Sequence, residues 1–236
     1  MTPKYTVPNT IRVLSEGSLP VLMLRLLQQN KIFFSVYTVA LTISAALFVT
    51  QPKGQEILFL NDLHNPFFDF VFKYTTRLAE LPLFIFILVV VIRFSFGMGF
   101  VLLTNCSLTF LIIQLLKKVV FESHVRPALF FSGSVELNFV QGIQTAYYHS
   151  FPSGHTAGAF ALFTMMAFFV KDKRWGALFI FLSLMVGLSR MYLLQHFLVD
   201  VMAGSAIGVA VSIIFYLTFV RSAYYQNLSW KDKSLI

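Results

Sequence analysis

The sequence is poor in charged residues and in cysteine. Asp, Glu, Lys and Arg make up 12% of its 236 residues, whereas hydrophobic residues make up 57%, and the mean hydropathy is +0.76. Water-soluble domains carry about twice this share of charge, so the composition predicts an integral membrane protein. The single cysteine, Cys106, has no partner for an intramolecular disulfide, which also excludes a metal site built from cysteines.

Acidic residues are scarcer than basic ones. Ten Asp and Glu stand against 18 Lys and Arg, which gives a formal net charge of +8. Most of the basic residues lie at the ends of apolar runs, a distribution typical of membrane topology rather than of nucleic-acid binding. We therefore expect the membrane to be the protein's surroundings, and we expect no nucleic-acid partner.

Long apolar runs predict the fold. A helix rises 1.5 Å per residue and needs about 20 residues to cross a hydrocarbon layer of roughly 30 Å. We expect an all-α integral membrane bundle of six transmembrane helices, which forms one domain over residues 1–236. Short interfacial helices are expected within 51–80 and within 1–30, where Arg25 interrupts an apolar run and argues against a cleaved signal peptide. The six expected spans are 32–49, 81–96, 100–116, 154–170, 175–193 and 197–220.

The positions of the basic residues predict the orientation of the bundle. Six spans place both ends of the chain on one side, and eleven of the 18 basic residues fall on that side. Because cytoplasmic loops are enriched in Lys and Arg, we expect both termini in the cytoplasm and the loop 117–151 on the external face. The eleven residues are Lys4, Arg12, Arg25, Lys31, Arg93, Lys171, Lys173, Arg174, Arg221, Lys231 and Lys233.

Three polar clusters lie at the external ends of the expected spans. Ionisable groups close to a membrane interior are costly and mark functional sites. The loop 117–151, which contains the first cluster and leads to the second, is about 35 residues long and exceeds the usual connections of compact bundles, which also favours a functional role. The clusters are Lys117-Lys118 with Arg126-Pro127, the turn Pro152-Ser153-Gly154-His155-Thr156, and Ser189-Arg190 with His196 and Asp200.

The third cluster combines a histidine with a carboxylate. His196 and Asp200 are four residues apart, so on a helix they share one face and are able to hydrogen-bond. A carboxylate behind a histidine fixes the tautomer and leaves the other ring nitrogen free to act as a nucleophile. Lys118, Arg126 and Arg190 supply positive charges that suit a phosphate group and its transition state.

The middle cluster predicts a helix start that binds an anion. Ser153 is a capping residue, and the N–H groups near Ser153 and Gly154 lack partners within the helix. Such N–H groups bind anions such as phosphate. His155, in the first turn, is placed to donate a proton to the departing oxygen.

Together the clusters resemble the signature of the type 2 phosphatidic acid phosphatase superfamily. That signature is a lysine followed by Arg-Pro, a Pro-Ser-Gly-His turn, and Ser-Arg with a histidine and an aspartate beyond it. The second and third parts match fully here. The first departs from the pattern, because seven residues instead of six separate Lys118 from Arg126, and Lys117 is the alternate for the phosphate-binding lysine.

The resemblance, which covers 117–200, implies a metal-independent and cofactor-free enzyme. In such enzymes the residue at the position of His196 attacks phosphorus, a phosphohistidine forms, and water releases phosphate. The implied substrate is a lipid phosphate in a bacterial inner membrane, with the site on the periplasmic face. Candidates are polyprenyl diphosphates such as undecaprenyl diphosphate, phosphatidylglycerol phosphate, phosphatidate and lipid A phosphates.

Alternative functions remain open at this stage. A lipid phosphotransferase would use the same phosphohistidine, whereas a lipid-binding or transport protein would need the cations without the nucleophile. The vanadium-dependent haloperoxidases share the motifs but are soluble, so the apolar spans argue against that activity. The sequence makes no prediction about protein partners or oligomeric state.

Overall fold

The computed structural model describes residues 18–235, and every regular element in that range is a helix. The expected all-α fold is therefore confirmed. Residues 1–17, with Lys4 and Arg12 and the first part of the expected N-terminal interfacial helix, lie outside the described residues. The elements are α2 (Leu19–Gln29), α3 (Lys31–Thr50), α4 (Gln55–Asp62), α5 (Pro66–Thr75), η1 (Thr76–Ala79), α6 (Leu81–Phe94), α7 (Phe96–Leu115), η2 (Leu116–Val120), α8 (Pro127–Phe130), α9 (Gly154–Phe169), α10 (Trp175–Tyr192), α11 (Leu198–Phe215), η3 (Tyr216–Val220) and α12 (Ala223–Gln226).

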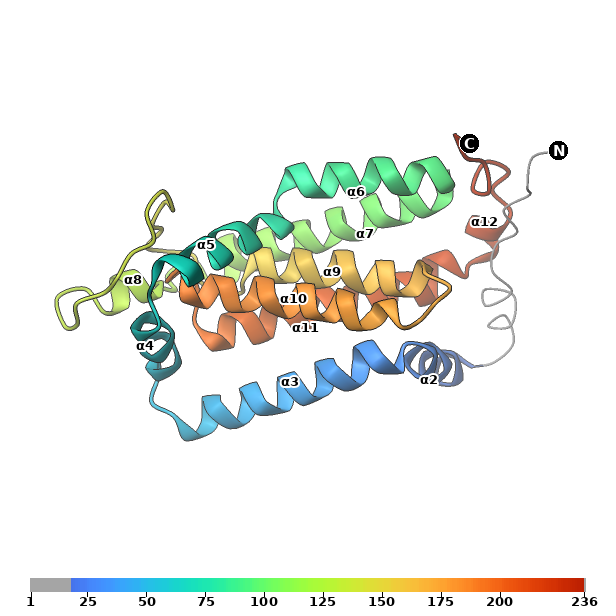
Figure 1. The fold of residues 1–236 in the computed structure, drawn as a ribbon. Helices are drawn as coiled ribbons and strands as arrows, with labels where there is room; N and C mark the ends of the chain where they lie inside the picture. Colours follow the sequence, from blue (N-terminus) through green and yellow to red (C-terminus); the bar gives the residue numbers. More distant parts are fainter. Residues whose placement is uncertain (1–17, 236) are drawn as a thin grey trace.

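The helices form an elongated bundle with two distinct ends (Figure 1). Helices α9, α10 and α11 run side by side through its centre, with α6 and α7 along one flank and α3 along the other. The short helices α4, α5 and α8 gather at one end, and α2 and α12 lie at the opposite end. The three polar clusters belong to the end that carries α8.

Helix α9 is the centre of the packing, and two glycines of α11 let the helices touch. A Cβ atom on Gly204 would lie 2.5 Å from the carbonyl oxygen of Ser153, and one on Gly208 would collide with the carbonyl oxygen of Ala157. Small residues permit this kind of close backbone approach between membrane helices. The contact at Gly204 also holds the start of α9 against α11, which carries Asp200.

Four helical segments are long and apolar enough to cross a membrane: Lys31–Thr50, Phe96–Val120, Trp175–Tyr192 and Leu198–Val220. A fifth span results if Pro66–Ala79 and Leu81–Phe94, which meet at a bend of 53°, count as one. Helix α9 is apolar, but its 16 residues make it about 24 Å long, shorter than the hydrocarbon layer. The protein is an integral membrane protein, and the expected number of six spans stays a prediction.

Two boundaries differ from the expectations. The turn between α6 and α7 falls at Ser95 rather than at the glycines Gly97 and Gly99, which lie buried in the first turns of α7. The Ser95 hydroxyl caps α7 by accepting a hydrogen bond from the N–H of Met98 at 3.2 Å. Residues 66–75, expected as an interfacial helix, continue into α6 through η1.

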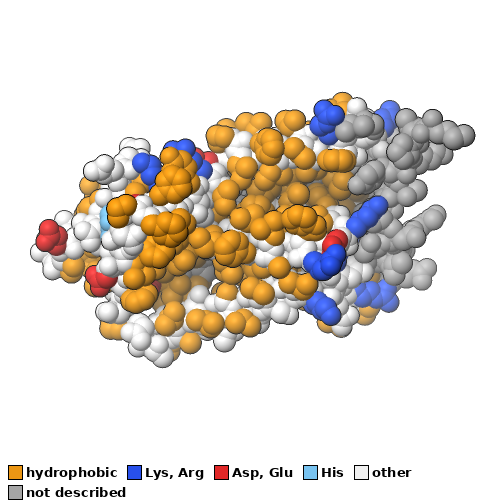
Figure 2. Space-filling model, viewed as in Figure 1, with side chains coloured by type: hydrophobic (Ala, Val, Ile, Leu, Met, Phe, Trp, Pro, Cys, Tyr) orange, Lys and Arg blue, Asp and Glu red, His pale blue; other side chains and the backbone are white. Residues whose placement is uncertain are grey.

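The surface reflects the membrane environment. Figure 2 shows a broad band of hydrophobic side chains around the middle of the molecule, with most charged side chains toward its two ends. On α3, Val39, Ile43 and Phe48 are more than half exposed. In water such a surface would be unfavourable, whereas in lipid it needs no protein partner.

Candidate active site

The three clusters converge on one cavity at the end of the bundle that carries α8. The cavity has a volume of about 820 Å³ and is lined by residues of η1, α6, α7, α9 and the α10–α11 junction. Its polar wall is cationic or neutral, apart from Glu80, and such a set suits an anion rather than a metal ion. The site residues on that wall are Lys117, Arg126, Gly154, His155, Arg190 and His196.

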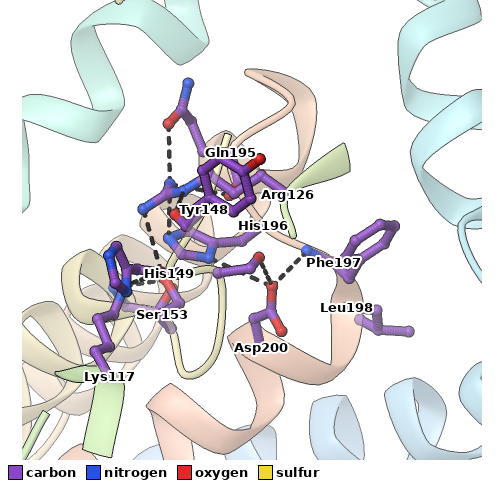
Figure 3. A network of polar contacts seen from close by, with 12 residues as sticks. Lys117, Arg126, Tyr148, His149, Ser153, Gln195, His196, Phe197, Leu198 and Asp200 are labelled. Atoms are coloured by element: carbon purple, nitrogen blue, oxygen red, sulfur yellow. Dashed lines mark hydrogen bonds and ion pairs between the residues drawn. The ribbon is translucent and has the colours of Figure 1, made fainter. Parts of the chain in front are cut away.

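His196 lies between an arginine and an aspartate (Figure 3). Its Nδ1 is 3.4 Å from Oδ2 of Asp200, and its Nε2 is 3.4 Å from Nη1 of Arg126. The same Oδ2 accepts hydrogen bonds from the Ser150 hydroxyl and, at 2.9 Å, from the N–H of Phe197. A carboxylate held in this way fixes the hydrogen on Nδ1 and leaves the lone pair of Nε2 on the cavity side.

The environment keeps the imidazole of His196 uncharged. The side chain is almost fully buried, and burial together with the charges of Arg126, Arg190 and Lys117 lowers the pKa of His196 well below its usual value. The neutral form is the one that has a lone pair to offer an electrophile. Burial likewise lowers the pKa of Arg126, and the charge of Asp200 offsets part of that effect.

Arg126 is oriented by neutral acceptors alone. Its Nε donates to the carbonyl of Tyr148 at 2.8 Å, and its Nη1 donates to the backbone and side-chain oxygens of Gln195, both at 3.0 Å. Its Nη2 lies 3.4 Å from the carbonyl of His149. These contacts fix the guanidinium without neutralising it, so its charge stays available to a phosphate.

Arg190 is buried and only partly satisfied. Its Nη1 donates to the Thr76 hydroxyl at 2.8 Å, and its Nε is buried without a hydrogen-bond partner in the structure. A buried guanidinium with an unused donor is costly. A bound phosphate oxygen would supply both an acceptor and a countercharge.

The Ser153 turn forms the expected helix start, but its donors differ from the expectation. Ser153 uses its hydroxyl as the cap of α9, at 3.4 Å from the N–H of Thr156, and its own N–H donates to the carbonyl of Asp200 at 2.9 Å. Ser153 is fully buried. The N–H groups of Gly154 and His155 have no acceptor among the described residues, and both residues line the cavity. The N–H of Ser153 is therefore occupied, whereas the N–H groups of Gly154 and His155 are left available to an anion.

Of the two lysines, Lys117 reaches the cavity. It lines the wall, and its Nζ donates to the carbonyl of His149 at 2.8 Å. Lys118, our first choice from the sequence, is exposed and does not line the cavity. Both lie in η2, a π-helical segment, which accommodates an extra residue in a helix. Eight residues separate Lys117 from Arg126, two more than in the family pattern, and the π turn accommodates one of them.

The segment 53–56, which lies far from the motifs in the sequence, contacts residues next to them. Glu56 of α4 accepts a hydrogen bond from the N–H of Leu198, in the first turn of α11, at 3.2 Å. The Lys53 ammonium lies 4.8 Å from the ring centres of both Phe130 and Phe197. The segment 53–56 therefore contacts the residues that follow Arg126 and those that follow His196.

Several of these groups were missed by sequence reasoning: Ser150, Gln195, Thr76, Lys53 and Glu56. None belongs to a motif. Ser150, Thr76 and Glu56 each act through one side-chain contact with a distant residue, Lys53 contacts two distant rings, and Gln195 lies beside His196. The carbonyls of Tyr148 and His149 have no side-chain signature at all. Of these groups, Gln195 alone had a signal in the sequence, because it is a polar residue next to His196.

A buried histidine beside a carboxylate, with three cations at the same end of a membrane bundle, is the arrangement expected of a membrane-embedded enzyme that acts on phosphate esters. The comparison with protein families agrees with this class. The model of the PAP2 superfamily matches residues 94–224, which is more than half of the chain. The protein belongs to the PAP2 superfamily and is a phosphoric ester hydrolase.

Two curated proteins illustrate the relationship. The chain is 26% identical to a lipid A 4'-phosphatase from Bacteroides thetaiotaomicron over 169 residues, which cover 68% of this chain and 74% of that protein. It is 37% identical to a probable lipid phosphate phosphatase 4 from Arabidopsis thaliana over 93 residues, 34% of this chain. That match spans 30% of the Arabidopsis protein.

Solved structures share the fold. The crystal structure of Aquifex aeolicus LpxE superposes with a TM-score of 0.60 at 24% identity, covering 69% of this chain and 93% of that one. The PAP2-type phosphatidylglycerolphosphate phosphatase from Bacillus subtilis superposes with a TM-score of 0.55 at 21% identity, covering 77% and 92%. At these identities the likeness extends to the fold alone.

Proposed function

We propose that the protein is a lipid phosphatase that hydrolyses a phosphomonoester or diphosphate of a membrane lipid through a phosphohistidine. The shape of the cavity carries this proposal. Its polar wall holds His196, Lys117, Arg126 and Arg190, and the same cavity continues along apolar residues of α6 and α7. The apolar residues include Leu81, Phe84, Phe110 and Leu111. A lipid fits such a cavity, because its phosphate meets the cations while its chain stays beside the exposed side chains of Leu81, Phe110 and Leu111.

Each step of the proposed reaction has a residue that would perform it. Nε2 of His196 attacks phosphorus, and the bond from phosphorus to the leaving oxygen breaks. His155 gives its proton to that oxygen, and the negative charge of the bound phosphate favours the protonated form of His155 beforehand. Water then attacks phosphorus and gives a proton back to His155, and the bond from phosphorus to Nε2 breaks, which releases phosphate and restores the neutral His196.

Electrostatics lowers the barrier of both steps. Phosphoryl transfer depends mainly on positioning and on charge that surrounds the transferring oxygens. Lys117, Arg126 and Arg190 provide that charge, and the N–H groups of Gly154 and His155 add neutral donors. Asp200 stabilises the positive charge that the imidazole of His196 acquires when its Nε2 bonds to phosphorus.

The names of the relatives support a lipid as the substrate. The Bacteroides relative is a lipid A 4'-phosphatase, and the Arabidopsis relative is a probable lipid phosphate phosphatase. The described basic residues of the predicted cytoplasmic set lie toward the end with α2 and α12, opposite the site. This asymmetry supports a periplasmic site in a bacterial inner membrane, with both termini in the cytoplasm.

The test is phosphate release by the purified full-length protein in detergent. We expect release from at least one member of a panel of phosphatidate, phosphatidylglycerol phosphate, polyprenyl diphosphate and lipid A. We expect His196→Ala to abolish it and His124→Ala, whose side chain does not line the cavity, to retain it. With a substrate labelled in its terminal phosphate, a short reaction should leave acid-labile, base-stable label on the wild-type protein and none on His196→Ala. Full activity of His196→Ala would overturn the mechanism, and transfer of label to a second lipid would identify a phosphotransferase instead.

A further inference from the structure

Glu80 is the one acidic residue among the described residues that line the active-site cavity. It lies at the bend between η1 and α6 and is partly buried. Arg190, Lys117 and His155 line the same cavity. A carboxylate is unexpected in a cavity that binds phosphate, because like charges repel and the low dielectric of a buried site strengthens the repulsion.

The contacts within the protein do not account for this carboxylate. Glu80 is the N-cap residue of α6, yet its side chain makes no capping hydrogen bond. Within residues 18–235 it makes no side-chain hydrogen bond and no ion pair closer than 4.0 Å. Its negative charge attracts the guanidinium of Arg190 from a longer distance. The carboxylate therefore weakens the positive potential of the cavity, but it occupies no hydrogen-bond donor of Arg190.

Glu80 belongs to the mostly apolar stretch of wall that η1 and α6 contribute, and its charge acts on Arg190 of the polar wall. Arg190, His155 and His196 lie on the polar wall, whereas Leu81 and Phe84, which follow Glu80 in α6, belong to the apolar wall. A lipid whose phosphate lies on the polar wall and whose chain lies along the apolar wall places the atoms between them near this junction. Those atoms are the part of the headgroup that bears the phosphate.

We propose that Glu80 is a specificity-determining residue that selects the headgroup of the lipid phosphate. It accepts a hydrogen bond from a hydroxyl or amino group next to the phosphate being removed, and it repels a second phosphate at the same place. The substrate class is therefore a lipid monophosphate carried on a hydroxylated or aminated unit, such as a glycerol or a sugar, in preference to a prenyl diphosphate. This inference rests on the proposed lipid phosphatase activity.

The experiment compares wild type with Glu80→Gln on two matched pairs of substrates in detergent. The first pair is a lysophosphatidate with a lauroyl chain, which has a free hydroxyl, and dodecyl phosphate, which has none. The second pair is farnesyl diphosphate and farnesyl monophosphate. Glu122→Gln is the matched control, because it removes the same charge from an exposed loop position that does not line the cavity.

We expect Glu80→Gln to lower kcat/KM for the lysophosphatidate about fivefold relative to dodecyl phosphate, since a charged acceptor becomes a neutral one. We also expect it to raise kcat/KM for the diphosphate relative to the monophosphate by a similar factor, about fivefold. Glu122→Gln should leave both ratios unchanged. The ratios cancel any loss of folded protein, and Glu80→Ser serves as a second variant that also removes the charge.

The outcomes separate this proposal from the one on which it rests. If wild type hydrolyses these lipids and Glu80→Gln changes all four rates by one common factor, Glu80 has only a structural role and the inference is overturned. If wild type releases phosphate from none of them and from no member of the wider panel, the lipid phosphatase activity itself is wrong. A shift of either ratio in the opposite direction also contradicts the inference.

Discussion

The region matched by the family model, residues 94–224, and the described region before it, residues 18–93, contribute differently to the site. Every group assigned a chemical step or a phosphate contact lies in the later region. The earlier region supplies contacts that hold those groups: Thr76 on Arg190, Glu56 on the first turn of α11, and Lys53 on Phe197. The motif residues therefore depend on a supporting surface that no motif marks.

The strongest expected effect lies in the later region. Asp200→Asn keeps the size of the side chain but turns an acceptor into a mixed donor and acceptor, which disturbs the tautomer of His196 and removes the charge that stabilises the imidazolium. We expect kcat to fall on the order of 10³-fold, as for other histidines that lose a supporting carboxylate. The measurement is phosphate release under saturating substrate. A loss smaller than tenfold would mean that Asp200 serves the packing of α11 rather than the chemistry.

A matched pair within η2 sharpens the assignment of the lysine. Lys117→Ala removes a cation from the cavity wall, and we expect kcat/KM to fall roughly tenfold or more, the value of one charge-assisted contact. Lys118→Ala changes an exposed side chain, so its kcat/KM should stay within about twofold of wild type. Equal losses in both variants would show that the two lysines share the phosphate contact.

The contact between Thr76 and Arg190 tests the earlier region directly. Thr76→Val is nearly isosteric and removes the hydroxyl that accepts from Arg190, which leaves a second buried donor of the guanidinium unpaired. We expect kcat/KM to fall about tenfold and the melting temperature to drop, because an unpaired buried donor costs about 1–3 kcal/mol. Thr76→Ser, which retains the hydroxyl, should recover most of the activity. An unaffected Thr76→Val would show that Arg190 is held by the rest of its surroundings.

The smallest effect on rate is expected at the α4 brace. Glu56→Ala removes the acceptor for the Leu198 N–H at the start of α11, a contact comparable to a helix cap worth about 1 kcal/mol. We expect kcat to fall about fivefold with little change in KM, and Glu56→Gln, which keeps an acceptor oxygen, to restore it. Equal effects of the two variants would assign the role to the charge of Glu56 instead of to the cap.

The protonation of His196 provides a test that does not depend on rate. Because burial and three neighbouring cations lower its pKa, its ring should remain neutral as the pH falls through 6.5, where an ordinary histidine gains a proton. The measurement is ¹⁵N NMR of histidine-labelled protein in detergent without substrate, with His196→Gln to assign the signal. A midpoint at or above 6.5 would contradict the electrostatic description of the cavity.

The sequence was informative where a pattern repeats or a motif is dense. Apolar runs predicted the helical fold, and the clusters around Arg126, His155 and His196 predicted residues that the structure brings to one cavity. Helix boundaries were predicted less accurately. The turn before α7 falls at Ser95, whose hydroxyl caps the helix, and the two glycines that follow lie inside α7, where they suit close helix packing. The number of six spans stays a prediction, because α9, with 16 residues, is shorter than the hydrocarbon layer.

The supporting contacts were beyond sequence reasoning for a physical reason. Ser150, Thr76 and Glu56 each make one hydrogen bond to a residue that is 50, 114 and 142 positions away, respectively. A single polar residue has no periodicity, so nothing in its neighbourhood along the chain shows which distant atom it meets. At Ser153 and Gly154 the opposite holds. The motif predicted the start of α9 correctly, but it did not show that the N–H of Ser153 donates to a carbonyl of α11 while that of Gly154 does not.

The π turn at η2 accommodates one of the two extra residues between Lys117 and Arg126. A π turn holds one residue more than an α turn, so the side chains beyond it are rotated by about 100° from the course of an unbroken helix. Loss of one residue just ahead of the two lysines would bring Lys118 to the azimuth that Lys117 has now. At the end of this helix the lysine ammonium group therefore keeps its direction even when the number of residues between the lysine and Arg126 changes.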